Sequence, residues 1–364
     1  MATIALDIQA IVVDWVYRLS QHEWEVDYDT LLACALVCRA WRPIAQRLLF
    51  RRIPRDPREP TDVRRPPSLL LLLHILRAHP HLAVHARSIR LTLDSEARID
   101  PDPDSDPVDV ALLKACPQVA RIIITEFDDS LTPTLEARLR AIPVYPESLA
   151  LSGKHEMINR VLQIWPNVRT LDIGQPFTLY NDDPPLIRIP GAVQSLSFPA
   201  NSPSEWISET ADDLPALRSL DLMHPLWSDG DWCRRLCASG LLKRLRTLVL
   251  IGRLPPSEIL EQLEQLESLV FDELPDQGIS LPRTLQHVGY HCGSQPWNAP
   301  PKEATILVAA LRALDGLQLV TVTRSDLPAE IQSTLMEACR EMDVEFVTFE
   351  TMEHFPRPVY VDWI

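Results

Sequence analysis

The chain has 364 residues, 46% of them hydrophobic, and carries a formal net charge of −15 with a pI near 5.1. This length accommodates one large domain, or a small domain followed by a large one, with a real hydrophobic core. The acidic balance argues against a protein whose general task is to bind nucleic acid or anionic membrane. Seven cysteines, behind a start that lacks the pattern of a signal peptide, predict reduced thiols in the cytoplasm or nucleus.

The first 50 residues predict two short amphipathic helices. Apolar residues recur at helical spacing in the first of them: Ile4, Ile8, Ile11 and Val12. In the second, residues 30–41, the residues Leu32, Leu36 and Val37 fall along one stripe. Asp29 or Thr30 is a suitable cap at its start, and Pro43 should end it. Two helices of this size make no stable core alone, so they need a partner.

The same residues resemble an F-box of the kind found in large fungal families. The resemblance rests on residues 4–14, IALDIQAIVVD, and on residues 31–41, LLACALVCRAW, with Ile4 and Ala5 where the family usually has Leu-Pro. Such a resemblance implies docking onto a Skp-type adaptor and, through it, onto a cullin. The adaptor-binding residues that it implies are Ile4, Ile8, Ile11, Val12, Leu31, Leu32, Leu36, Val37, Cys38 and Trp41.

Residues 54–85 read as a connector between an F-box-like module, residues 1–53, and the rest of the chain. The leucine run 69–73 predicts a buried helix over residues 68–76, which is far shorter than the ~20 residues needed to span a bilayer. Residues 39–65 hold nine arginines and three acids. We interpret them as a solvated helix end and connector rather than a nucleic-acid patch, because no aromatic residues interleave as stacking platforms.

From about residue 86 to the C-terminus the chain repeats the unit apolar-x-x-apolar-x-apolar. Residues 217–222, LRSLDL, and 245–250, LRTLVL, are two copies, and successive copies are 19 to 33 residues apart. Each apolar-x-apolar triplet has the alternation of a short strand. Helical patterns lie between triplets, at residues 258–266, 303–314 and 329–342. Strand-helix units at such periods predict a solenoid.

The spacing resembles that of leucine-rich repeats, without the asparagine that usually follows the strand. Residues 86–364 are therefore expected to form an irregular α/β solenoid of parallel strands, a horseshoe with helices on the convex side. The two outer residues of each triplet should face the core and the middle one the concave side. A protein target is expected on that concave face, at Arg90, Arg121, Asp172, Ser197, Asp221, His287 and Thr321, with Thr348 in the last copy.

No recognisable catalytic, phosphate-binding or metal-binding motif occurs, so we expect no enzyme activity, cofactor or metal. Residues 100–109 alternate acids like a calcium loop, but Ser105 replaces the glycine that its sharp turn requires. A mobile acidic loop is the preferred interpretation.

Two functions remain open. In one, the chain recruits an unknown protein substrate to a Skp–cullin–F-box type ubiquitin ligase. In the other, it is a leucine-rich-repeat scaffold whose N-terminal helices only cap the solenoid.

Overall fold

The computed structural model describes residues 28–53, 69–91, 93, 106–124, 131–174, 187–199, 214–223, 238–254, 257–273, 280–290, 302–323 and 329–349. The chain forms two compact units, Met1–Val168 and Arg169–Ile364. We call them unit 1 and unit 2. The boundary falls inside the repeat region.

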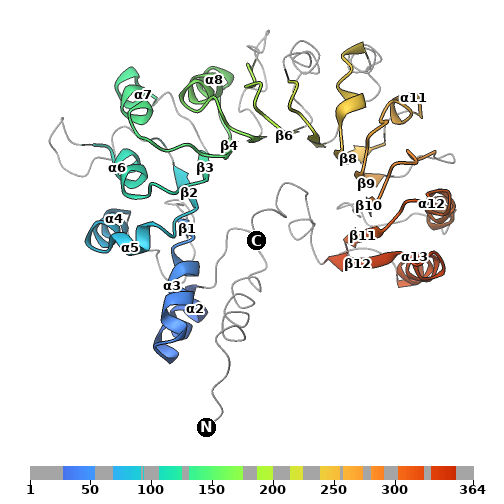
Figure 1. Ribbon diagram of the computed structural model, residues 1–364, viewed down its shortest axis with the longest axis horizontal. Helices are drawn as coiled ribbons and strands as arrows, with labels where there is room; N and C mark the ends of the chain where they lie inside the picture. The colour runs from blue at the N-terminus through green and yellow to red at the C-terminus, as the bar shows by residue number, and fades with distance from the viewer. Residues whose placement is uncertain are drawn as a thin grey trace. The chain divides into compact units, whose positions relative to one another are not determined.

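The described part of unit 1 starts with two helices and continues as strands that alternate with helices (Figure 1). Its elements are α2 (Tyr28–Val37), α3 (Trp41–Leu49), β1 (Arg52–Ile53), α4 (Leu69–Ala78), α5 (Pro80–Ala83), β2 (Ser88–Leu91), α6 (Val108–Ala115), β3 (Arg121–Ile124), α7 (Pro133–Arg140), β4 (Ser148–Leu151) and α8 (His155–Ile164). The strands β1, β2, β3 and β4 pair in chain order, and every pair is parallel.

Unit 2 repeats this plan with more strands and fewer described helices. Its elements are β5 (Thr170–Ile173), β6 (Ser195–Pro199), β7 (Ser219–Met223), η2 (Leu242–Arg244), β8 (Thr247–Arg253), α11 (Ser257–Leu260), β9 (Ser268–Glu273), β10 (His287–Tyr290), α12 (Lys302–Arg312), β11 (Leu319–Thr323), α13 (Ala329–Glu341) and β12 (Glu345–Phe349). Here too the strands pair in chain order and in parallel. The predicted fold class, an α/β solenoid of leucine-rich-repeat type, is confirmed.

The triplets form the cores of both units. In unit 1 the register aligns Ile89, Ile122 and Leu149, all 0% exposed. In unit 2 the equivalent row is Leu171, Leu196, Leu220, Leu248, Leu269, Val288 and Val320, each at most 1% exposed. Each such side chain contributes roughly 1.5–3 kcal/mol before chain entropy is subtracted. A repeat therefore gains its stability only from stacked neighbours.

A regular set of backbone hydrogen bonds joins consecutive repeats. The carbonyl just before one strand accepts two N–H groups from the start of the next strand. The Arg87 carbonyl accepts from Ala120 and Arg121, both at 2.9 Å, and the Glu267 carbonyl accepts from Gln286 and His287 at 2.9 and 3.0 Å. These bonds pair backbone groups at the start of each strand, where an unpaired polar group would be costly if buried.

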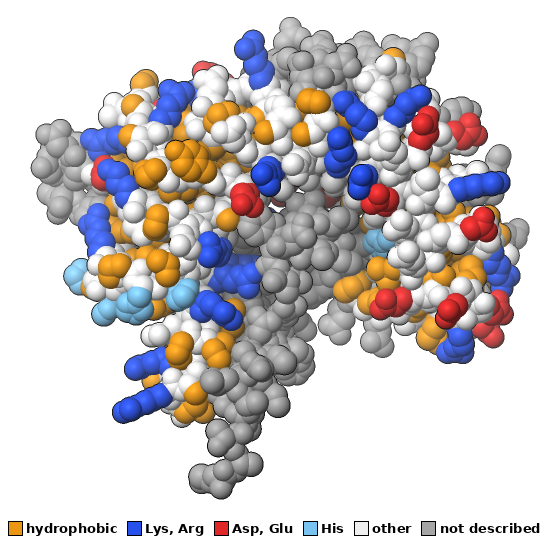
Figure 2. Space-filling model, in the orientation of Figure 1, with side chains coloured by type: hydrophobic (Ala, Val, Ile, Leu, Met, Phe, Trp, Pro, Cys, Tyr) orange, Lys and Arg blue, Asp and Glu red, His pale blue; other side chains and the backbone are white. Residues whose placement is uncertain are grey.

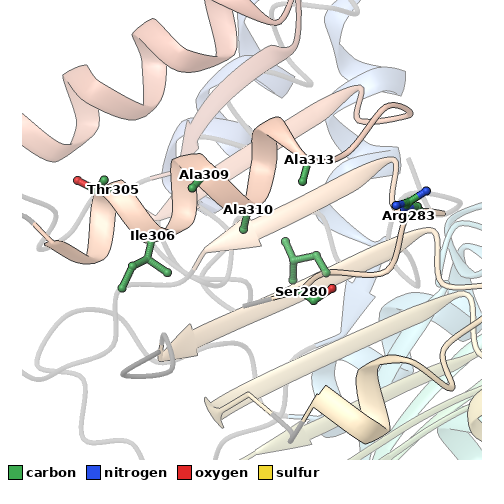
Figure 3. A pocket seen from close by; sticks show the side chains of 8 residues that line it. Ser280, Arg283, Thr305, Ile306, Ala309, Ala310 and Ala313 are labelled. Carbon is green, nitrogen blue, oxygen red and sulfur yellow. The ribbon is translucent and has the colours of Figure 1, made fainter. Parts of the chain in front are cut away.

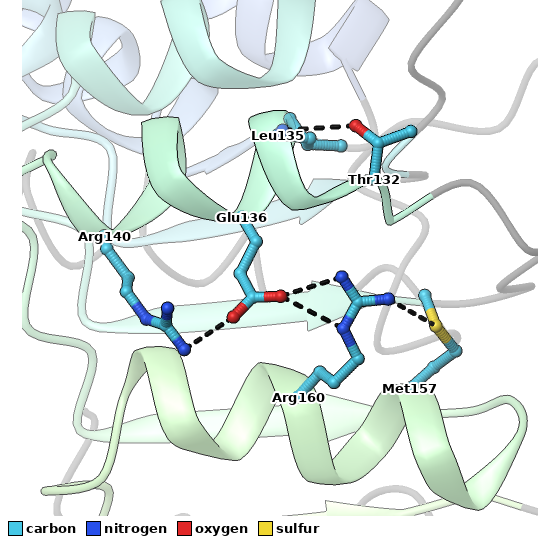
Figure 4. Close-up of polar contacts among 6 residues, drawn as sticks. All are labelled: Thr132, Leu135, Glu136, Arg140, Met157 and Arg160. Atoms are coloured by element: carbon cyan, nitrogen blue, oxygen red, sulfur yellow. Dashed lines mark hydrogen bonds and ion pairs between the residues drawn. The ribbon is translucent and has the colours of Figure 1, made fainter.

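Charged groups tie the helix layer of unit 1 together. Glu136 on α7 accepts two hydrogen bonds from Arg160 on α8, at 3.0 and 2.8 Å (Figure 4). Arg140, four residues after Glu136, forms an ion pair with the second carboxylate oxygen. Thr132 caps α7 by accepting a hydrogen bond from the Leu135 N–H at 3.2 Å. The forked Arg160–Glu136 contact therefore fixes α8 against α7.

Several sequence-based expectations about helix bounds are corrected. The helix expected over 30–41 is two helices, and Pro43 lies in the first turn of α3 rather than ending a helix. Proline is tolerated there because the first N–H groups of a helix have no partner inside it. Asp29 and Thr30 lie inside α2, so neither is a cap residue. Asp109, assigned to a mobile loop, is buried on α6 at 2% exposure.

The connector and the short repeats also differ from expectation. The helix expected over 68–76 is present as α4. Of the described side chains in the leucine run, only Leu73 is buried, together with Leu76 one turn later, while Leu70 and Leu71 are half exposed. The strand β1 pairs with β2, so the sheet starts at Arg52 rather than near residue 86. The helix expected over 258–266 shrinks to the four residues of α11, followed by turns.

Candidate functional site

An exposed apolar surface lies on α2. Leu32 is 51% exposed, Leu36 is 81% exposed and Val37 is 63% exposed. The spacing i, i+4 and i+5 places all three on one side of the helix. Large apolar side chains exposed together on one helix face are typical of an interaction site. We call Leu32, Leu36 and Val37 the α2 face.

The neighbours of the α2 face hold the helix in place. Leu31 is fully buried and packs with Cys34 of α2 and with Ala45 and Leu48 of α3. Trp41 is half-buried against this cluster. Of the predicted adaptor residues, Leu31 is therefore buried and Trp41 is half-buried, whereas Cys38, next to Val37 in the sequence, is exposed. The remaining predicted adaptor residues, Ile4, Ile8, Ile11 and Val12, lie outside the described residues.

A second candidate surface is the face of each sheet that points away from the helices (Figure 1). We call it the inner face of that unit. In unit 1 it carries Arg90 and Arg121, as expected, and also Arg52 of β1. The register aligns Arg52 with Ser88 and Ser88 with Arg121. All three arginines are half-buried.

The inner face of unit 2 is less accessible than the sequence suggested. Asp172, Ser197 and His287 are half-buried there, but Asp221 is 7% exposed and Thr321 is 0% exposed. Thr348 is not on this face, because β12 pairs one residue out of step with the motif. Thr348 is aligned with Val322, whose side chain is buried in the core, and Val347 takes the inner-face position beside Thr321.

A small apolar cluster explains part of this burial. Val249 on β8 and Val270 on β9 hold the inner-face positions next to Asp221, and both are buried. Phe349, at the end of β12, packs against them. Aliphatic and aromatic contact removes this part of the inner face from water. It therefore works as a second core rather than as a free surface.

A chain of three polar residues crosses the same face of unit 2. The Ser268 hydroxyl is 2.7 Å from Nδ1 of His287, and Nε2 of His287 is 2.7 Å from the Thr321 hydroxyl. Burial lowers the pKa of His287 to about 4, so the ring is neutral near pH 7. One ring nitrogen then donates and the other accepts. These two hydrogen bonds link β9, β10 and β11 through side chains.

One pocket of about 460 Å³ lies in unit 2, on the helix side. Figure 3 shows α12, with Ile306, Ala309 and Ala310, on one side and the segment with Ser280 and Arg283 on the other. Its lining is mostly small and apolar, and Arg283 is the charged side chain among the lining residues. Among the described lining residues no second ionisable group accompanies Arg283, so they do not supply the paired acid and base that general acid–base catalysis uses.

Sequence reasoning missed the roles of Arg52, Val249 and Phe349. Arg52 was assigned to the N-terminal module because a two-residue strand carries no readable alternation. Val249 and Val270 were available as a signal, since they are apolar where most other triplets have a polar middle residue. Their partner Phe349 becomes visible only in three dimensions.

Comparison with known proteins identifies no family: no protein-family model matches the chain, and no curated protein is similar to it in sequence. Two solved structures resemble it at 14% identity. A Bacteroides fragilis protein gives a TM-score of 0.36, with 64% of this chain and 65% of that chain covered. The TLR13–ssRNA13 complex gives a TM-score of 0.40, with 73% of this chain covered. This chain spans just under two thirds of the first protein and 39% of the second.

The strand order, parallel register and repeated core rows define this chain as a leucine-rich-repeat-like α/β solenoid. Solenoids of this kind present extended surfaces and commonly act as protein-interaction scaffolds. Among the described residues, no helix has both the length and the apolar character that crossing a bilayer requires.

Proposed function

We propose that this protein is the substrate-recruiting subunit of a Skp–cullin–F-box type ubiquitin ligase. In this role α2 and the residues before it dock onto a Skp-type adaptor, which joins the chain to a cullin. The solenoid holds a protein target beside the ligase. The subunit itself performs no covalent chemistry, and its contribution is proximity.

The α2 face carries the proposal. Three large apolar side chains that match the F-box-like motif point outward, while Leu31 and Cys34 on the opposite side hold α2 onto α3. A helix that lacked a partner would lose little by having polar residues at Leu32, Leu36 and Val37. Their burial in a complex would contribute roughly 1.5–3 kcal/mol each.

The test is a pull-down of the full chain with a purified Skp-type adaptor. Wild type is compared with the double variant Leu32→Asp, Val37→Asp, which places two charges in the apolar contact. We expect at least a tenfold loss of adaptor binding. Because both positions are already exposed, the variant should fold normally, which circular dichroism checks.

A matched control is available on α4. Leu70 and Leu71 are 46% and 50% exposed, so Leu70→Asp with Leu71→Asp makes the same chemical change on another helix. This variant should bind the adaptor like wild type. Undiminished adaptor binding by the folded α2 variant would refute the proposed docking mode.

A plain interaction scaffold is the second candidate. It is favoured by the direct passage from α3 into β1, which is the first strand paired in the sheet of unit 1. Such a helix pair suits the cap that solenoids require at their ends. Absence of any adaptor binding by the wild-type chain would support this candidate.

A further inference from the structure

Three arginines form a cationic group on the inner face of unit 1. Arg52 and Arg121 stand in one register row on β1 and β3, with Ser88 of β2 between them. Strands lie about 4.8 Å apart, so the backbones of Arg52 and Arg121 are roughly 10 Å apart. Arg90 follows two residues after Ser88 and therefore faces the same way.

The surroundings of this group contain no opposing charge on the same strands. The other inner-face residues of β2, β3 and β4 are Ser88, Ser148, Ile123 and Ala150. Neither aspartate nor glutamate occurs in the described strands β1 to β4. Ser148 and Ile123 are each 5% exposed and Ser88 and Ala150 are half-buried, so the three arginines are the long side chains that a ligand would meet on this face.

More cations lie around this edge of unit 1. Figure 2 shows Lys and Arg side chains gathered near β1 and β2, beside the histidines of α4 and α5. The pKa of His85 is lowered by partial burial and then by the neighbouring charges of Arg47, His81 and Arg87. The part of this shift that comes after burial reflects the positive charges of Arg47, His81 and Arg87, which lie between α3 and the start of β2.

The inner face of unit 2 has a different character. It carries the half-buried Asp172 and the buried Asp221, and its middle part is occupied by Val249, Val270 and Phe349. Among the described side chains of the two inner faces, the half-buried arginines are those of unit 1, in a chain whose net charge is −15.

We propose that the inner face of β1, β2 and β3 binds an acidic peptide segment of the recruited protein, with Arg52, Arg90 and Arg121 contacting its carboxylates or phosphates. This proposal rests on the recruiting role proposed above. A guanidinium has five N–H donors in a fork that matches these oxyanions. Each of the three arginines already makes another interaction in the chain, and its number of donors leaves capacity for a ligand.

A peptide fits this face better than single-stranded nucleic acid. Nucleic-acid grooves of this type combine cations with aromatic side chains on which bases stack. The described strands β1 to β4 carry no aromatic residue. Their inner face instead has the half-buried Ser88 in the register row between Arg52 and Arg121, which suits an extended peptide.

The test uses fluorescence anisotropy with the full chain and three labelled probes of twelve residues or nucleotides. The probes are a glutamate-rich peptide, the same peptide with two phosphoserines, and a single-stranded RNA. The variant Arg90→Gln, Arg121→Gln is compared with the control Arg39→Gln, Arg77→Gln, which removes the same charge at two exposed positions, one in the turn between α2 and α3 and one on α4.

We expect at least one peptide probe to bind wild type and the control, and to bind the Arg90/Arg121 variant at least tenfold more weakly. The stronger of the two peptides identifies carboxylate or phosphate as the preferred group. The proposal is overturned if neither peptide binds, if both variants lose binding equally, or if only the RNA probe depends on Arg90 and Arg121.

A parallel adaptor pull-down separates the two proposals. The Arg90/Arg121 variant should retain wild-type adaptor binding, because neither residue is on α2. Peptide binding without adaptor binding would support the arginine site and count against the ubiquitin-ligase role.

Discussion

The ionisation of His287 affects the stability of unit 2. Its pKa is about 4 in the folded chain because burial disfavours the charged ring, against about 6.5 in an unfolded chain. Between these pH values the unfolded chain binds a proton that the folded chain does not. The free energy of unfolding should therefore fall as pH drops from about 6.5 to 4, by on the order of 3 kcal/mol at most.

Urea unfolding at pH 7 and pH 5 measures this effect. The variant His287→Gln keeps a donor and an acceptor between Ser268 and Thr321 but does not titrate. Its loss of stability between the two pH values should be clearly smaller than that of wild type. Equal losses in the two proteins would show that other groups cause the pH dependence.

Leu31 and Leu36 show how neighbouring leucines on one helix have opposite roles. Leu31 is 0% exposed and Leu36 is 81% exposed. Leu31→Ala should destabilise the α2–α3 pair by about 2 kcal/mol or more, since it leaves a cavity against Ala45 and Leu48. Leu36→Ala should change stability by less than about 0.5 kcal/mol.

Hydrogen exchange at the amides of α2 and α3 is the suitable measurement, because it reports local opening. Protection should drop for Leu31→Ala and stay at the wild-type level for Leu36→Ala. A reversed order would mean that the two faces of α2 are wrongly assigned.

At the scale of elements, β12 is held by more than its pairing with β11. Its five residues are exposed or half-buried, unlike those of the strands before it. Phe349 adds a contact across the inner face to Val249 and Val270. Phe349→Ala should therefore destabilise β12 by about 1–2 kcal/mol, which is less than the 3–5 kcal/mol typical of a fully buried phenylalanine.

Hydrogen exchange of the β12 amides, compared between wild type and Phe349→Ala, checks this prediction. Met336→Ala on α13 is the control, since Met336 is 42% exposed. Faster exchange in β12 for both variants alike would argue that Phe349 has no special role in anchoring the strand.

The helix lengths between strands follow from repeat length. Only 21 residues separate Leu248 from Leu269, and α11 has four residues. By contrast, 32 residues separate Val288 from Val320, and α12 has eleven. In the short repeat, Leu263 and Leu266 are still buried, but turns with i to i−3 hydrogen bonds position them. The apolar pattern predicted the burial correctly and the helix wrongly.

At the scale of the whole molecule, the two proposed binding surfaces, one for the adaptor and one for an acidic peptide, lie on different parts of unit 1. The α2 face is apolar and suits a lasting contact, whereas the inner face of β1 to β3 is cationic and suits selection by charge. Solenoids can combine such roles because each repeat contacts mainly its neighbours. A substitution on one surface should leave the other intact, and the paired experiments above depend on this separation.

The sequence by itself determined where the strands of the solenoid lie. Triplets such as Leu220–Leu222 and Leu248–Leu250 predicted strands at the positions where β7 and β8 are found. This succeeded because the alternation of a strand is a local property of two or three residues. The fold class follows from it, since regular units of strand and connection can bury their apolar rows only by stacking.

Only the tertiary structure decided which of these side chains are accessible. Leu31 and Leu32 are adjacent and chemically identical, yet α3 covers the first and leaves the second exposed. Arg52 lies beside Arg90 and Arg121 because β1 pairs with β2 and β2 pairs with β3. Its row partners Ser88 and Arg121 are 36 and 69 residues further along the sequence. Burial and clustering depend on partners distant in sequence, and a local pattern does not contain them.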